Sequence, residues 1–231
     1  MSAIRMMVVT GGHDFDRPGF TALLDALPQV TWHEQRHPAA LESLDRRGVA
    51  EVDVVLFFDF GQSMPADRRA AFTGVFDGST GFVFLHHAIH NYPDWDEYPR
   101  ILGGYWGHRA FEIDGRLYGP STYTHTRVRI EPVADHPIGR GLAAFEVDDE
   151  VYGRFYTAPG VETFATTNHP AADPPAGWTH RYRDARVAYL QPGDSPACHA
   201  HPDYRRLLLR TIQWAAGRLP ADAGGPGPAP V

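Results

Sequence analysis

The chain has 231 residues, 43% of them hydrophobic, and a formal net charge of −7, which fits one domain with a sizeable core. The acidic balance argues against a nucleic-acid partner, which would favour a basic surface. The one cysteine, Cys198, cannot form an internal disulfide, so nothing indicates an oxidising compartment and we expect a cytoplasmic protein. The apolar run at residues 6–9 is too short for a signal peptide or a membrane span, so we interpret it as a core strand.

The first part of the chain alternates short apolar runs with amphipathic segments. Uninterrupted apolar runs predict strands that are buried on both faces. The segments between them carry apolar residues three and four positions apart or begin at a proline, which is typical of helices. We expect strands over residues 6–10, 30–34, 52–58 and 81–85, and helices over residues 17–27, 38–47 and 65–76.

Strands that alternate with helices predict an α/β fold with a doubly wound, mostly parallel sheet and right-handed crossovers. In such sheets ligands bind at the carboxyl ends of the strands. The strand at 81–85 ends directly at His86 and His87, and a further helix is expected near Asp94. A late core strand at 186–190 and a final helix at 202–217 complete the predicted architecture.

The middle of the chain, about residues 103–183, differs in composition. Residues 122–130 alternate polar with β-branched side chains and predict a strand with one wet face, and two more strands are expected at 161–167 and 178–182. Residues 145–152 form a short, acidic and aromatic segment. We expect an inserted β-rich and loop segment over the carboxyl edge of the sheet, within a single domain of residues 1–219. The Pro/Gly-rich residues 220–231 predict a flexible tail.

Several short motifs follow one another along nearly all of residues 6–218. They are Gly11-Gly12-His13, residues 53–58, residues 81–88, Leu102-Gly103-Gly104, His136-Pro137-Ile138, Asp149-Glu150-Val151-Tyr152, residues 186–193 and Trp214-Ala215. Their order and spacing resemble the ThuA-like (trehalose utilisation) family. The resemblance implies the flavodoxin-like fold of the class I glutamine amidotransferase-like superfamily and a link to trehalose and related sugars. Family members often have a histidine where this chain has Asp194.

Glutaminase chemistry needs a cysteine thiolate on the turn after a core strand and a histidine to activate it. The turn after residues 81–85 carries His86 and no cysteine, and Cys198 lies beyond the late strand. We therefore expect no glutaminase activity, and we interpret Cys198 as a bystander.

Imidazoles and carboxylates follow several of the predicted strands. Since the carboxyl ends of these strands converge, we expect the side chains to meet in one crevice. Such a set can run acid/base chemistry or bind a divalent metal, with zinc or manganese as the candidate cofactor. Neighbours on a strand face opposite sides, so we do not expect His86 and His87 to bind the same ion. The residues concerned are His13, Asp59, Gln62, His86, His87 and Asp194.

The pair Asp149-Glu150 with Tyr152 suits sugar binding, because a carboxylate bonds hydroxyls while a ring stacks on the apolar face of a sugar. We expect His86, His13 and Glu150 to be catalytic. The expected substrate-binding residues are Asp59, Gln62, His87, Trp106, His108, Tyr152 and Asp194. The pair His199 and His201 is expected in a solvated loop.

The sequence thus predicts an enzyme or binding protein for a sugar or oxidised sugar derivative, with hydrolysis or isomerisation as the reaction class. Two alternatives stay open: a non-catalytic sensor or scaffold, and a metal-dependent hydrolase. The expected partner is a small sugar-like molecule, with no nucleic acid and no membrane. A homodimer is plausible because the aromatic-rich middle offers surface to bury.

Overall fold

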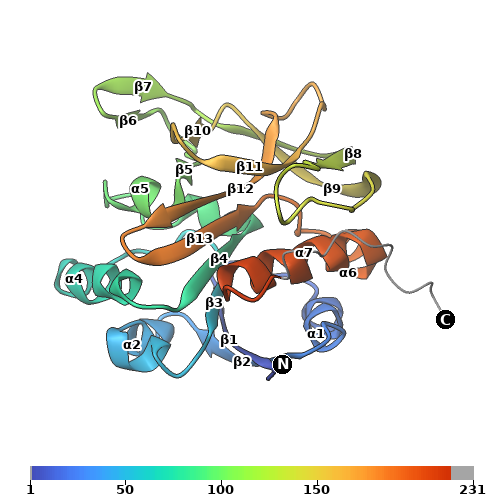
Figure 1. Ribbon diagram of the computed structural model, residues 1–231. Helices are drawn as coiled ribbons and strands as arrows, with labels where there is room; N and C mark the ends of the chain where they lie inside the picture. The colour runs from blue at the N-terminus through green and yellow to red at the C-terminus, as the bar shows by residue number, and fades with distance from the viewer. Residues whose placement is uncertain (1, 220–231) are drawn as a thin grey trace.

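The computed structural model describes residues 2–219, and the predicted tail at 220–231 lies outside the described residues. Within them a nine-stranded mixed sheet has the order β2-β1-β3-β4-β13-β12-β11-β8-β9 (Figure 1). One half is parallel, as predicted for an α/β fold. Its strands are β1 (Ile4–Gly11), β2 (Val30–Arg36), β3 (Val54–Asp59), β4 (Gly81–Leu85) and β13 (Ala185–Leu190).

Helices cover both faces of the parallel half. The alternation of side chains along β1 gives each face of the sheet its own core. Met6 and Val8 pack in the core on one face, and Met7 and Val9 pack in the core on the other. The first core also contains residues of α1 (Arg17–Asp25), α6 (Pro196–Ala200) and α7 (Pro202–Ala215). The second contains residues of α2 (Ala40–Ser43), α3 (Arg46–Val49), α4 (Ala66–Gly74), the 3₁₀ helix η1 (Val75–Asp77) and α5 (Tyr98–Leu102). The fold is therefore doubly wound.

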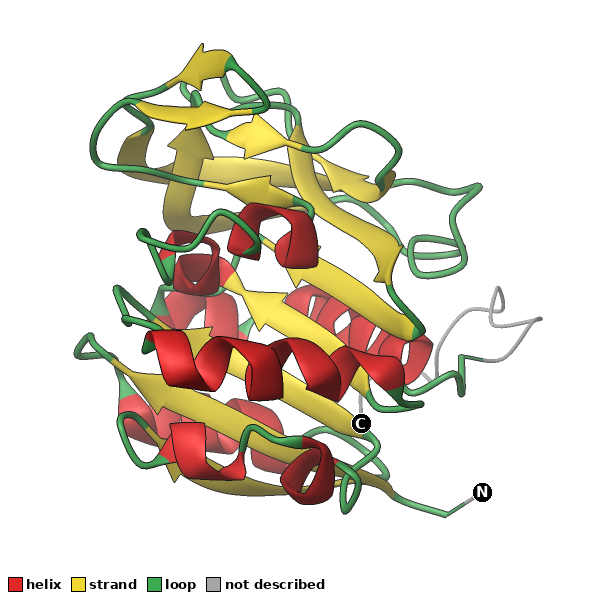
Figure 2. Ribbon diagram, turned by 90° about the vertical axis from the view of Figure 1, so that its left-hand side faces the viewer, coloured by secondary structure: helices red, strands yellow, loops and turns green. Residues whose placement is uncertain are grey.

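The other half of the sheet is antiparallel and comes from the middle of the chain. Its strands are β8 (Thr122–Pro132), β9 (Phe145–Gly153), β11 (Glu162–Thr166) and β12 (Pro175–Tyr182). Short pairs flank them: β5 (Gly104–Tyr105) with β10 (Tyr156–Thr157), and β6 (Phe111–Ile113) with β7 (Arg116–Tyr118). Figure 2 shows this region as strands and loops beyond the helix-covered half. The β-rich character was predicted; the limits of domain and insertion stay a prediction.

Several predicted elements differ from the observed ones. The helix expected over 38–47 is two short helices, because the Asp45 side chain accepts a hydrogen bond from the Gly48 N–H and begins a new turn. The helix expected near Asp94 begins at Tyr98. Residues 145–152 lie in β9, which pairs with β8 over nine positions. Among the described residues, no helix is both long and apolar enough to cross a bilayer.

Candidate functional site

The carboxyl ends of the parallel strands meet at one edge, and the chain turns there at His86. His86 has φ of 49° and begins the 3₁₀ helix η2 (His86–His90) directly after β4. The two adjacent imidazoles therefore do not alternate as they would on a strand, and their ring centroids are 4.3 Å apart and nearly perpendicular. The expectation that His86 and His87 face opposite sides was wrong, because it assumed extended backbone.

His86 is fully buried and is held at both ring nitrogens. Its Nδ1–H donates to the backbone carbonyl of Gln191, at the end of β13. Its Nε2 lies 3.2 Å from Glu150 Oε2 and 2.8 Å from the Tyr152 hydroxyl, both on β9. The hydroxyl of Tyr189 donates to the His86 carbonyl at 3.2 Å. The predicted residues His86, Glu150 and Tyr152 thus lie together, although up to 66 positions separate them.

Burial and the neighbouring charges shift the pKa values of His86 and Glu150 in opposite directions. Burial lowers the pKa of His86, but the hydrogen bond to Glu150 and the carboxylates of Asp149 and Asp194 outweigh it, so that its pKa is raised. Burial raises the pKa of Glu150, but hydrogen bonds from His86 and Tyr152 and the charge of His86 lower it. The two groups therefore favour an imidazolium–carboxylate pair.

His87 approaches the same carboxylate oxygen of Glu150. Its Nε2 is 3.9 Å from Glu150 Oε2 and 3.7 Å from Asp194 Oδ1. Burial and the positive charge of His86 lower its pKa far below the ordinary value, so the ring is neutral. Its Nδ1 has no hydrogen-bond partner among the described residues. His13 packs against this ring with centroids 4.5 Å apart.

Asp149 and Glu150 are neighbours on β9 and point to different partners. The Asp149 carboxylate accepts hydrogen bonds from the backbone N–H groups of Gly193, Asp194 and Ser195 at 2.7, 3.1 and 2.8 Å. Asp149 is 2% exposed, so it fixes the loop that carries Asp194 rather than facing solvent. The sequence showed the pair of acids but not this division of roles, which depends on the strand alternation of β9.

A small aromatic cavity adjoins Glu150. Its volume is about 210 Å³, and one of its lining residues is Trp106, whose indole N–H donates to the Thr122 carbonyl at 3.1 Å. The ring of Trp106 lies 5.7 Å from Tyr152 and 4.6 Å from His108. The lining residues are Phe60, His87, His90, Trp106, His108, Tyr123, Glu150 and Tyr152. Phe60, His90 and Tyr123 were not among the predicted site residues, although His90 stands in the same histidine-rich run as His86 and His87.

Five of the predicted site residues do not line this cavity: His86 and Asp194, whose contacts are given above, and Asp59, Gln62 and His13. Asp59 is buried and pairs with His37 Nε2 at 2.8 Å. Gln62 donates to the Phe60 carbonyl at 2.8 Å. His13 packs against the His87 ring and is absent from the lining. Their predicted roles stay predictions, and the partner His37 had no recognisable signal in the sequence.

The histidines after β13 are not in a solvated loop. His199 is 1% exposed on α6, and its Nε2 lies 2.8 Å from the Gly193 carbonyl. His201 caps α7 through the Asp203 N–H. The sequence missed α6 because the helix is only five residues long. Cys198 on α6 is buried, and burial raises the pKa of its thiol.

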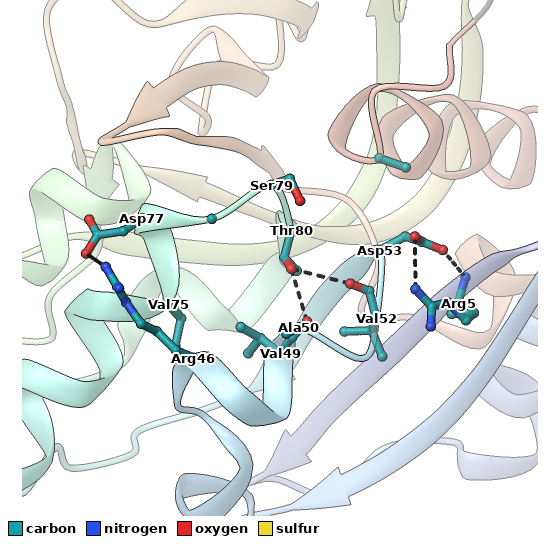
Figure 3. A pocket seen from close by; sticks show the side chains of 12 residues that line it. Arg5, Arg46, Val49, Ala50, Val52, Asp53, Val75, Asp77, Ser79 and Thr80 are labelled. Atoms are coloured by element: carbon teal, nitrogen blue, oxygen red, sulfur yellow. Dashed lines mark hydrogen bonds and ion pairs between the residues drawn. The ribbon is translucent and has the colours of Figure 1, made fainter.

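A larger cavity of about 470 Å³ lies at the opposite edge, around the amino ends of β1, β3 and β4 (Figure 3). Its charged residues are paired with one another: Arg46 with Asp77, and Arg5 with Asp53. The Thr80 hydroxyl lies 3.0 Å from the Val49 carbonyl and 3.3 Å from the Val52 carbonyl. This cavity is larger than the one beside Glu150, but its charged side chains and the Thr80 hydroxyl already have partners.

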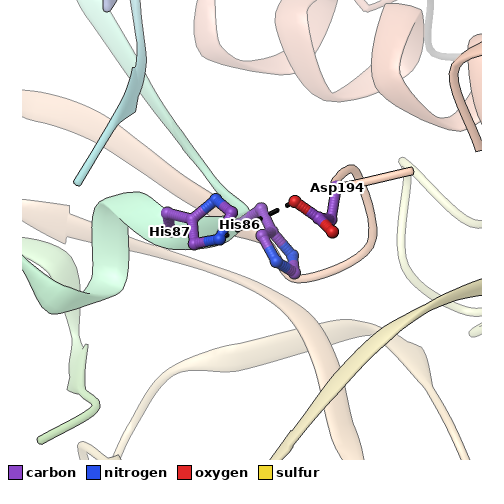
Figure 4. A group of neighbouring side chains, drawn as sticks. All are labelled: His86, His87 and Asp194. Atoms are coloured by element: carbon purple, nitrogen blue, oxygen red, sulfur yellow. Dashed lines mark ion pairs between the residues drawn. The ribbon is translucent and has the colours of Figure 1, made fainter. Parts of the chain in front are cut away.

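A group with the composition of a metal site lies at the carboxyl edge. His86, His87 and Asp194 each offer one donor atom, and these atoms lie within 4.8 Å of one another. Figure 4 shows the two rings and the carboxylate converging from the end of β4 and the loop after β13. Two imidazoles and a carboxylate are ligand types that zinc and other divalent metals accept.

The parallel strand order β2-β1-β3-β4-β13, with helices on both faces and polar groups at the carboxyl edge, defines a flavodoxin-like α/β protein. Within that class the chain belongs to the ThuA family, because the family model, described as trehalose utilisation, matches residues 6–215. The resemblance seen in the sequence is confirmed. A comparison with curated proteins gives no match.

Solved structures share the fold at low identity. A protein described as ThuA-like from Parabacteroides merdae ATCC 43184 is 20% identical, with a TM-score of 0.74 over 94% of this chain and 92% of that one. A cytoplasmic protein of Salmonella typhimurium LT2 is 10% identical, with a TM-score of 0.60 over 91% and 99%. A β-galactosidase from Bacillus circulans sp. alkalophilus is 11% identical, with a TM-score of 0.59 over 93% of this chain but 31% of that one.

Proposed function

We propose that this protein binds a sugar or an oxidised sugar derivative in the aromatic cavity and acts on it by hydrolysis or isomerisation. The observation that carries the proposal is the pairing of aromatic walls with the carboxylate of Glu150 in one cavity of about 210 Å³. Rings stack on the apolar face of a sugar, and a few placed polar groups fix its orientation. Trp106 and Tyr152 supply the first feature, and Glu150 supplies the second.

In this proposal Glu150 orients the ligand. Its lowered pKa keeps it ionised, and an ionised carboxylate accepts a hydrogen bond from a ligand hydroxyl. His86 holds the carboxylate in position from behind, because its other nitrogen is tied to Gln191. His87 and His108 line the same cavity and would contact the ligand.

Family membership supports a role in carbohydrate metabolism, since the family is described by trehalose utilisation. Two structural neighbours are described as cytoplasmic proteins, which supports the expectation of a cytoplasmic location. The likeness to β-galactosidase is a likeness of fold over part of that enzyme, so the choice of reaction does not depend on it.

Calorimetric titration with trehalose and with a keto-disaccharide tests the proposal, followed by product analysis by NMR. The Glu150→Gln variant should bind more weakly and lose turnover. The matched control is Glu146→Gln on the same strand, because the Glu146 side chain is 47% exposed and pairs only at the surface with Arg127. A wild-type protein that binds neither sugar, or a Glu150→Gln variant that behaves as wild type, would refute the proposal.

A further inference from the structure

We propose that His86, His87 and Asp194, with Glu150 as a fourth donor, form a binding site for one divalent metal ion, zinc or manganese. The site belongs to the same crevice as the proposed sugar cavity. Metal binding itself does not depend on the proposed function; only the contact between metal and substrate does.

The distances between the donor atoms are the first support for a metal site. Two ligands that bind zinc at 2.0–2.1 Å in a tetrahedral arrangement lie about 3.4 Å apart. The separations here are 3.2 Å for His86 Nε2 to Glu150 Oε2, 3.7 Å for His87 Nε2 to Asp194 Oδ1 and 3.9 Å for His87 Nε2 to Glu150 Oε2. A charge-assisted hydrogen bond is shorter, about 2.7–2.9 Å. The two His87 separations are too long for hydrogen bonds and close to those of ligands around a common ion.

The orientation of the donors carries the second step. A metal-binding histidine usually donates its other ring N–H to a carbonyl or carboxylate, which turns the free nitrogen toward the metal. His86 shares the outer half of this arrangement, because Nδ1–H donates to the Gln191 carbonyl; its Nε2 lies 3.2 Å from Glu150 Oε2 and 2.8 Å from the Tyr152 hydroxyl, and the ion would take the place of the hydroxyl contact. On binding, the metal takes the place of the Nε2 proton of His86. Asp194 is fixed in turn, since its own N–H is held by the buried carboxylate of Asp149.

The chemistry of the donor set carries the third step. Two imidazole nitrogens and two carboxylate oxygens suit zinc or manganese better than calcium or magnesium, which prefer oxygen ligands. His87 and Glu150 also line the aromatic cavity, so an ion between them would face it. A metal there would polarise a sugar carbonyl or activate a water, which favours a metal-assisted reaction on the sugar derivative.

The test uses untagged protein, treated with chelator, dialysed and titrated with zinc or manganese alone. We expect close to one metal per chain by calorimetry and elemental analysis, and visible absorption bands of tetrahedral coordination when cobalt replaces zinc. His87→Gln and Asp194→Asn should each weaken zinc binding by at least about 10-fold. His33→Gln, at an exposed position of β2, is the matched control and should bind as wild type.

Asp194→His separates coordination from a structural role, because it restores a ligand where Asp194→Asn removes one. Recovery of zinc binding and of the cobalt bands in Asp194→His supports the site. Circular dichroism checks that each variant is folded. Absence of stoichiometric binding, or equal binding by wild type, His87→Gln and Asp194→Asn, overturns the inference. Sugar titration of the metal-free protein is a separate measurement, so failure of one proposal is distinguishable from failure of the other.

Discussion

The two edges of the parallel sheet differ in how their polar groups are used. At the amino edge a cavity of about 470 Å³ is bordered by arginine–aspartate pairs and by a threonine bonded to carbonyls. At the carboxyl edge a cavity of about 210 Å³ adjoins buried imidazoles and carboxylates that converge without complete pairing. The comparison teaches that convergence of incompletely paired groups is a better basis than cavity volume for proposing a functional edge.

The largest effect is expected from Glu150→Ala. The change leaves the buried His86 without its carboxylate partner, which should lower the free energy of unfolding by about 3 kcal/mol or more. Any turnover of a sugar derivative should fall about 100-fold, because the ligand is no longer held in position. Urea unfolding and a turnover assay measure the two effects. Glu146→Ala on the same strand is the control, and equal behaviour of both variants would contradict the assigned difference.

Asp149→Asn should follow, because it weakens the acceptor for three backbone N–H groups of residues 193–195. We expect a loss of about 2 kcal/mol in the free energy of unfolding. Hydrogen exchange should become faster at the amide hydrogens of residues 193–195, which mass spectrometry or NMR can follow. Unchanged exchange in this loop would show that Asp149 does not position Asp194.

Tyr123→Ala tests the rim of the carboxyl-edge cavity with little risk to the fold. Tyr123 is 58% exposed and lies 6.2 Å from the Trp106 ring. Loss of one stacking surface should weaken sugar binding by up to about 10-fold, with no change in thermal stability. Leu117→Ala, at a residue that is 71% exposed on the β6–β7 hairpin, is the matched control for calorimetry. Equal affinities in the two variants would place the ligand elsewhere.

Thr80→Val tests the amino edge with a change that keeps the side-chain shape. The hydroxyl bonds to the Val49 or Val52 carbonyl are lost, so the free energy of unfolding should fall by about 1 kcal/mol. Sugar and metal binding should be unchanged, because this edge lies opposite the candidate site. If the folded variant bound the sugar or the metal much more weakly, the amino edge rather than the carboxyl edge would be the candidate site.

The smallest effect is a pH dependence at the amino edge. Burial raises the pKa of Asp53, but hydrogen bonds from Arg5 and the charge of Arg218 outweigh it and lower the pKa below the ordinary 3.8. The ionised carboxylate therefore stabilises the fold above the unfolded-state pKa, and this contribution is lost as the pH falls through the folded-state pKa. Wild type should exceed Asp53→Asn in stability at about pH 6 but not at about pH 2. Chemical denaturation at the two pH values measures this, and a constant difference would contradict it.

Much of the parallel half was predictable from local sequence. The strand β4 has the predicted bounds, because a strand buried on both faces needs an uninterrupted apolar run between two breaks. The rule that ligands bind at strand carboxyl ends then predicted His86, His87 and Asp194 as site residues, whereas Glu150 was predicted from the acidic pair beside Tyr152. Short elements were less predictable, as α3 and α6 show, because a single capping side chain decides where a helix of four or five residues begins.

The sequence by itself determined the class of fold, the family and the edge of the sheet where the polar residues gather, since these depend on hydrophobic pattern and motif order. Only the tertiary structure decided that His86 pairs with Glu150, that Asp149 holds the Asp194 loop and that Asp59 pairs with His37. Those pairings join residues 22 to 64 positions apart. Their choice depends on strand register and on one turn at His86, which local preferences do not specify.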